Sequence, residues 1–232
     1  MVDYRRLERD IPEIAAHVEQ VSELRVPLDT LKFEIVKYSL NGSVMSYSHS
    51  ERKARVFQDM IPPKYSQNEI NTILGHELTH HAQYSVEPFE KMVQTVERIK
   101  EGEESDEDRI RNICLSRFIE GDAYWVGDKL HQFYSRDILT TLYSFKNRML
   151  LKYAGVLFPL MAETLIDYYG MGGRRISTLI AEGGREAVNR LYRVGIEEIV
   201  NHFSNEVVER SITSGEKNFK AALAKVASII SS

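Results

Sequence analysis

A chain of 232 residues with 43% apolar and 28% charged side chains has the composition of an ordinary soluble globular protein. Its formal net charge is −4, and lysine and arginine are scattered along it. This argues against nucleic acid as a partner, because phosphate binding needs a clustered basic surface. The single cysteine, Cys114, excludes an internal disulfide and a zinc site built from paired thiolates.

No targeting or membrane segment is recognisable. The amino-terminal sequence lacks the apolar core of a signal peptide, and no apolar run approaches the roughly 20 residues that span a membrane. The longest apolar run, residues 153–161, is short and contains a proline. We therefore expect a cytoplasmic protein with no membrane partner, although secretion without a signal or loss of a pre-sequence would leave the same pattern.

The first predicted element is a helix that starts near Asp10 and Pro12, because apolar residues follow at helical spacing. Residues 31–38 then alternate in the manner of a strand, and Asn41-Gly42 predicts a hairpin into a second strand at 44–48. With a third short strand at 54–57, these segments predict a small antiparallel sheet.

The remainder predicts helices. Ser66-Gln67-Asn68-Glu69 has the form of a capping box, so a helix is expected from there to about Tyr84. The acidic segment 101–108 is expected to be a solvated loop, in which Ser105 caps a long amphipathic helix that continues to about Leu130. Further breaks between helices are expected at Gly155, Pro159, Gly170–Gly173, Gly183-Gly184 and Gly195, before a final helix over 217–230.

These elements predict an α+β protein in which a small amino-terminal antiparallel sheet precedes a mainly helical part. We expect a single domain over residues 1–232, with a helix and sheet lobe at 1–65 and a helical lobe at 66–232.

The most informative stretch is GHELTHH, residues 75–81, which lies in the predicted capped helix. Residues one turn apart project from nearly the same side of a helix, so His76 and His80 can offer two imidazoles to one zinc ion. Glu77 stands at the rim of that face, where it can act as general base toward a zinc-activated water. The alternative is an amphipathic helix with its polar residues in solvent.

A catalytic zinc site needs a third protein ligand. Glu120 is the best candidate, because a carboxylate between Phe118, Ile119 and Trp125 is costly to bury unless it is compensated. A solvent-facing Glu on the polar side of the helix is the alternative. His81 lies off the face of the other two histidines, so a packing contact or solvent exposure is expected for it.

Together these residues resemble the gluzincins, zinc metallopeptidases of the thermolysin-like clan in which a glutamate on a downstream helix completes HExxH. Glu120-Gly121-Asp122-Ala123 resembles the E-G-x-A form of that helix. A second block, from Tyr169-Gly170 through Gly183-Gly184 to Leu191-Tyr192, is similar to one in some gluzincin-like proteins. The resemblance covers about residues 66–205.

The resemblance implies a zincin-like fold, zinc as cofactor, the metal ligands His76, His80 and Glu120, and Glu77 as general base. It also implies that Tyr169 stabilises the oxyanion of the reaction. The sequence departs from thermolysin where an Asp one turn after the ligand glutamate supports a zinc-binding histidine, since Tyr124 stands there. Asp122 is then a candidate for that support, or it bonds only locally.

The resulting hypothesis is a zinc-dependent peptidase that acts on a peptide or protein substrate. In zincins an edge strand above the active-site helix binds an extended peptide, and residues 44–48 or the strand near Val56 can serve here. The alternatives are a non-catalytic scaffold stabilised by zinc and a hydrolase of another amide bond. Neither oligomeric state nor cleavage specificity follows from the sequence.

Overall fold

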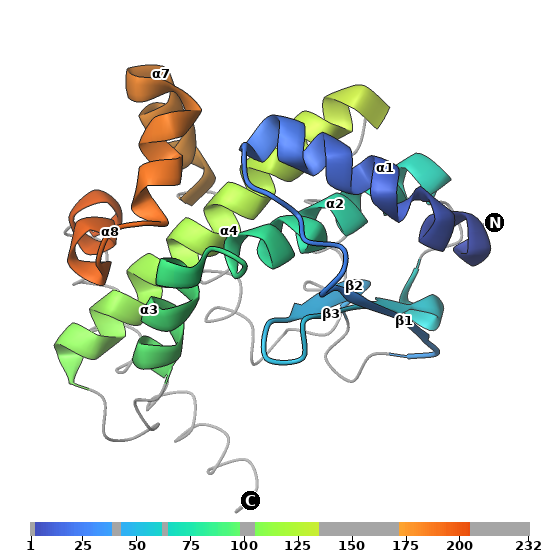
Figure 1. The fold of residues 1–232 in the computed structure, drawn as a ribbon, viewed down its shortest axis with the longest axis horizontal. Helices are drawn as coiled ribbons and strands as arrows, with labels where there is room; N and C mark the ends of the chain where they lie inside the picture. The colour runs from blue at the N-terminus through green and yellow to red at the C-terminus, as the bar shows by residue number, and fades with distance from the viewer. Residues whose placement is uncertain (1–2, 39–42, 62–64, 98–104, 135–171, 205–232) are drawn as a thin grey trace, which may run out of the picture.

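The computed structural model describes residues 3–38, 43–61, 65–97, 105–134 and 172–204, and within them it is an α+β protein (Figure 1). One small sheet is accompanied by helices on a shared apolar core. The elements are α1 (Tyr4–Ser22), β1 (Lys32–Val36), β2 (Met45–Ser48), β3 (Lys53–Phe57), a 3-10 turn (Gln58–Met60), α2 (Gln67–Gln83), α3 (Glu87–Glu97), α4 (Asp106–Tyr134), α7 (Gly172–Leu191) and α8 (Ile196–Phe203).

Helix α1 begins earlier than the sequence predicts. The side chain of Asp3 accepts hydrogen bonds from the backbone N–H groups of Arg5 and Arg6, both at 3.1 Å, and so caps the helix start. Pro12, expected near the start, lies inside the helix. The helix ends at Ser22, and Glu23 follows in the left-handed conformation with φ of 55°.

The predicted antiparallel sheet is wrong in its strand order. The sheet is mixed, in the order β1-β3-β2, with β1 parallel to β3 and β2 antiparallel to β3. The strands expected to form a hairpin across Asn41-Gly42 are therefore not neighbours. The hairpin joins β2 to β3 instead, and its turn contains Arg52 at φ of 50°, where the backbone N–H donates to the carbonyl of His49 at 3.1 Å.

Burial explains why β3 is central. Ala54, Val56 and Phe57 are buried, whereas β1 and β2 are mostly half-buried, so the most buried strand takes the position that is covered on both edges. Hairpin turns are recognised in a sequence by glycine or asparagine, which adopt the left-handed conformation easily. Here Arg52 adopts it, so the sequence gives no such signal at this turn.

Helix α2 lies between the sheet and α1 and is buried on nearly every side (Figure 1). Its predicted capping box is confirmed: Ser66 Oγ accepts from the backbone N–H of Glu69 at 3.3 Å, and the Glu69 carboxylate accepts from the N–H of Ser66. Its apolar residues, among them Ile70, Leu74 and Leu78 at 0% exposure, hold it in the core.

The long helix α4 crosses α2 (Figure 1). Its predicted cap is confirmed, since Ser105 Oγ accepts from the backbone N–H of Asp108 at 3.2 Å. The short helix α3, before the acidic segment, was not singled out in the sequence. It is anchored in the core by Phe89 and Val93, which are at most 1% exposed.

Helix α7 packs against α4 and bends where the sequence predicts a break, at Gly183 and Gly184, and Gly195 caps α8. The predictions at Gly155, Pro159, Gly170 and 217–230 lie outside the described residues. Within the described part of the chain, no helix is long and apolar enough to span a membrane.

The backbones of α4 and α7 touch at Gly121 and Gly172. A Cβ atom added at Gly121 would lie 2.7 Å from the Cα atom of Gly172, well inside van der Waals contact, so the two helices must separate to admit it. We predict that Gly121→Ala lowers the free energy of unfolding by about 1–3 kcal/mol, as measured by urea denaturation.

Gly127→Ala, on the same helix, is the matched control. Its Cβ would meet only His76 Cβ at 3.8 Å, an ordinary contact, and alanine favours helix more than glycine by about 1 kcal/mol. This variant should be at least as stable as the wild type, and equal stability of Gly121→Ala would contradict the close packing.

Candidate metal centre

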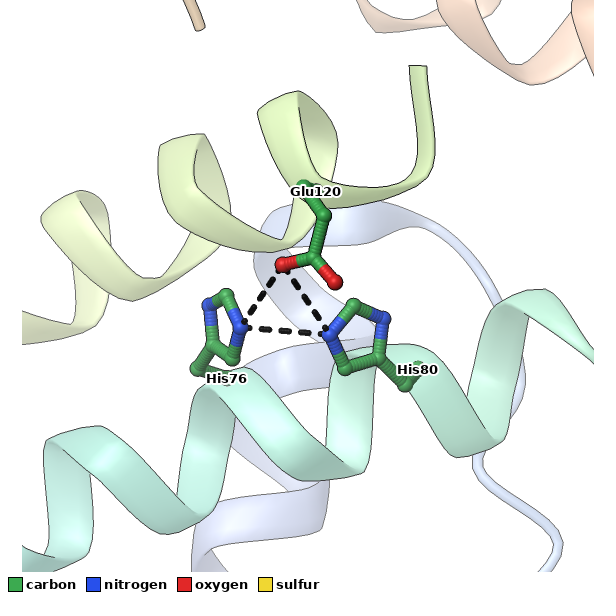
Figure 2. A group of neighbouring side chains, drawn as sticks. All are labelled: His76, His80 and Glu120. Carbon is green, nitrogen blue, oxygen red and sulfur yellow. Dashed lines mark hydrogen bonds and ion pairs between the residues drawn. The ribbon is translucent and has the colours of Figure 1, made fainter. Parts of the chain in front are cut away.

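Two imidazoles project from one side of α2 towards α4 (Figure 2). His76 and His80 stand one turn apart, and their Nε2 atoms lie 3.1 Å from each other. The ring planes are inclined at 88°. His80 is buried and His76 half-buried, so one ring is enclosed by protein while the other reaches the surface.

Glu120 enters this site from α4, opposite the two histidines (Figure 2). Its Oε2 atom lies 3.5 Å from Nε2 of His76 and 3.7 Å from Nε2 of His80. The helices come close here because Gly75, immediately before His76, has no side chain, and a Cβ atom there would collide with Leu130 of α4. The predicted carboxylate thus meets the predicted imidazoles.

The three side chains form a group that could hold a metal ion, with ligand atoms that all lie within 4.8 Å of one another. Glu120 Oε2 is buried and has no hydrogen-bond partner in the described part of the chain, which leaves a charged oxygen to be satisfied. In a tetrahedral zinc site, bonds of about 2.0–2.1 Å separate two nitrogens by about 3.3 Å. The observed distances therefore suit a metal of this size.

The electrostatics of the site favour a positive charge between the carboxylate and the rings. Burial alone would lower the pKa of His80, but the carboxylates of Glu120 and Glu77 and the hydrogen bond to Gln83 raise it to about 9. Burial would likewise raise the pKa of Glu120, but the neighbouring imidazoles of His80 and His76 hold it well below its usual value. In the metal-free protein His80 is therefore protonated at neutral pH, and its positive charge balances the carboxylate as a bound metal ion would.

Glu77 lies next to this group without belonging to the ligand set. It is 9% exposed, and its charge is close enough to raise the pKa of His80. The Glu77 carboxylate therefore lies beside the candidate metal site without being one of its three candidate ligands.

His81 faces away from the site and joins α2 to its neighbours. Its Nδ1 lies 2.8 Å from the hydroxyl of Tyr47 on β2, and its Nε2 lies 3.0 Å from the carbonyl oxygen of Pro27. The ring is fully buried, and burial lowers its pKa. A neutral ring that donates to Pro27 and accepts from Tyr47 satisfies both contacts, so His81 is a packing residue.

The sequence reasoning did not single out Gln83, whose Oε1 lies 3.0 Å from Nδ1 of His80. Gln83 lies one turn after the candidate ligand His80, and residues at this spacing share a helix face, so its position in the sequence could have indicated the contact. Asp122, considered as support for a histidine, reaches His80 only through Gln83, at 3.4 Å from the Gln83 amide nitrogen.

Tyr169 lies outside the described residues. Gly172, the first described residue of α7, packs against Gly121, which directly follows the candidate ligand Glu120.

No known family model, no curated protein and no solved structure matches the chain. The interpretation of this site therefore depends on its own residues and geometry.

We predict that the purified protein binds about one zinc ion per chain, and that His76→Ala or His80→Ala abolishes this binding. Glu120→Ala should weaken it, because the third ligand is lost. Metal content after dialysis, measured by atomic emission, provides the test. His81→Asn is the matched control and should keep its zinc, whereas full metal content in Glu120→Ala would contradict the ligand set.

Zinc affinity is expected to rise with pH up to about 9. The pKa of His80 is about 9 in the metal-free protein, so at neutral pH zinc must displace a proton, and above about 9 it need not. Each pH unit below this value should weaken binding by about tenfold. Calorimetry in buffers of different ionisation enthalpy should detect about one proton released per zinc near neutral pH. Binding without proton release would contradict the raised pKa.

Proposed function

We propose that the chain is a zinc-dependent peptidase. The observation that carries this proposal is the donor set of His76, His80 and Glu120, in which a buried carboxylate oxygen lacks a hydrogen-bond partner among the described residues. A second carboxylate, Glu77, stands beside the set. Ligands alone would serve a purely structural ion, and the additional base favours chemistry.

Two imidazoles and one carboxylate are a donor set of catalytic zinc sites. The same donors also hold non-haem iron(II), and zinc is favoured here by the HExxH spacing on one helix, with Glu77 between the two histidines. Three protein ligands leave a fourth position open, as in catalytic zinc sites, whereas structural sites usually close it with a fourth protein ligand. When bound, zinc supplies a Lewis acid that makes water acidic enough to react near neutral pH and polarises a carbonyl oxygen.

Glu77 is the proposed general base. Its carboxylate takes a proton from the attacking water and then gives it to the leaving amine, so that the peptide bond is broken without a free hydroxide or amide ion. Its near-complete burial, at 9% exposure, keeps bulk water from competing for that proton. Tyr169 remains the proposed donor to the oxyanion, on the sequence resemblance alone.

The sheet supports a peptide as substrate. Strand β2 is one edge of the sheet, and Tyr47 on it hydrogen-bonds His81, the residue directly after the candidate ligand His80. An extended peptide can add to such an edge by backbone hydrogen bonds. The strand near Val56, the other candidate, is central in the sheet and has no free edge.

The replacement Glu77→Gln separates catalysis from metal binding. The amide keeps the size of the side chain and removes its basicity, so zinc content and fold should be unchanged. Hydrolysis of a diverse peptide library should fall by about 10²–10⁴-fold, the usual contribution of a general base. Mass spectrometry of the cleaved library gives both rate and specificity.

Glu87→Gln, an exposed position on α3, is the control and should cleave like the wild type. A wild-type protein that holds zinc and cleaves nothing in the library would favour the alternative of a zinc-stabilised scaffold. Cleavage by Glu77→Gln at the wild-type rate would refute the proposed mechanism.

A further inference from the structure

We infer that Gln83 is a positioning residue for the ligand His80, and that a buried cluster of Asp122, Arg185 and Tyr192 holds Gln83 in place. This inference rests on the proposed metal site. It assigns the support of a zinc-binding histidine to residues of three helices and the turn after α7, none of which is a ligand.

The orientation of the Gln83 amide follows from its contacts. Its Nε2 donates to the backbone carbonyl of Ile119 at 3.1 Å and to Asp122 Oδ2 at 3.4 Å, so its Oε1 faces His80 Nδ1 at 3.0 Å. An amide held this way can only accept from His80. The proton of the neutral ring is thereby placed on Nδ1, and the lone pair of Nε2 is directed at the metal.

Asp122 makes this orientation obligatory. It is fully buried and ion-pairs with Arg185, whose Nη2 donates at 2.8 Å, while the hydroxyl of Tyr192 donates to Oδ2 at 2.5 Å. A carboxylate without a proton can only accept, so the side chain that Gln83 turns towards it must be its NH₂ group. A flipped amide would leave its oxygen against the carboxylate.

Arg185 ties the cluster to the rest of the fold. Its guanidinium is nearly buried, lies 5.6 Å from the ring centre of Trp125, and donates through Nε to the carbonyl of Ser22 at 2.8 Å. The ion pair therefore connects the end of α1 with α4 and α7. Buried ion pairs often add little to stability compared with apolar packing, which favours a role in orientation.

Helix α4 carries both carboxylates. Glu120 and Asp122 are two residues apart on one helix, so the carboxylate that is the candidate ligand and the carboxylate that orients Gln83 move together. Any shift of α4 relative to α2 would change both contacts at once. The position of Glu120 and the orientation of Gln83 therefore both depend on where helix α4 lies.

The first test compares Gln83→Met with Gln67→Met on the full chain. Both residues lie on α2, and both side chains hydrogen-bond through their amide groups, but Gln67 bonds Asn71 and Asp3 at the other end of the helix. Zinc dissociation constants are measured by competition with a chelator. Gln83→Met should weaken binding by about 10–100-fold, the usual effect of losing a partner of a ligand, and Gln67→Met by less than about twofold.

A readout that a merely structural role would not move is the ring proton of His80. In the zinc-loaded wild type, ¹H–¹⁵N spectra should show a slowly exchanging Nδ1–H signal that is absent from Gln83→Met. If Gln83→Met fails to fold, Gln83→Asn replaces it: the shorter amide stays polar beside Asp122 and no longer spans the distance to His80. The same loss of affinity and signal is expected.

Tyr192→Phe tests the outer part of the cluster. It should weaken zinc binding less than Gln83→Met, and adding it to Gln83→Met should have no further effect, because Tyr192 acts through Gln83. Additive effects of the two substitutions would show that Tyr192 does not act through Gln83. Unchanged zinc affinity in Gln83→Met would overturn the positioning role while leaving the metal site intact, whereas a wild type that binds no zinc would overturn the metal site itself.

Discussion

The packing of α2 against α4 is the contact on which the site depends, because it brings the partly buried carboxylate of Glu120 against the imidazoles of His76 and His80. A carboxylate without compensation is expensive to bury, and among the residues that the structure describes the two histidines are the ones that lie close enough to offset it. In the metal-free protein His80 does so by holding a proton, which explains why its pKa is raised although burial opposes the charge. A divalent ion would satisfy the same oxygen with more charge and from all three ligands at once.

The surrounding elements fix the separation of these two helices. Gly75 allows Leu130 to approach α2, and on the far side of α4 the glycines at 121 and 172 bring α7 into backbone contact. His81 holds α2 to the sheet through Tyr47, so that the helix cannot rotate about its own axis without breaking buried hydrogen bonds.

Some local signals were read correctly from the sequence, although the start of α1 was not, and the pairing of the strands was predicted wrongly. The caps at Ser66 and Ser105 and the bend at Gly183 depend on neighbours within a few residues, and these predictions are confirmed. The strand order depends on which strand is most buried, and the β2–β3 turn uses Arg52 in a conformation that its residue type does not announce. The link from Arg185 to the site spans distant segments, so no spacing rule could have found it.

Within the candidate site, the positions on α2 followed from helix geometry alone, whereas the approach of Glu120 depends on tertiary packing. The carboxylate was singled out because apolar neighbours in the sequence implied its burial, and the structure places it opposite the histidines. The sequence does not distinguish Gln83 from any other glutamine at a helix end, because its role depends on its hydrogen-bond partners His80, Ile119 and Asp122. Residue identity predicts which side chains can bind a metal, but not which ones orient them.

The distribution of buried polar groups gives an independent reason to regard this region as functional. Glu77, His80, Gln83 and Asp122 are all buried close to one crossing of two helices, in a core that is otherwise mainly apolar. A core selected for stability alone gains little from such groups, because each must be desolvated and then satisfied by a partner of fixed geometry. Strongly shifted pKa values with specific charged partners are characteristic of functional sites. The chain therefore accepts an energetic cost at the place where the proposed ligands, the proposed base and their supports meet, which supports the proposal that this site is catalytic.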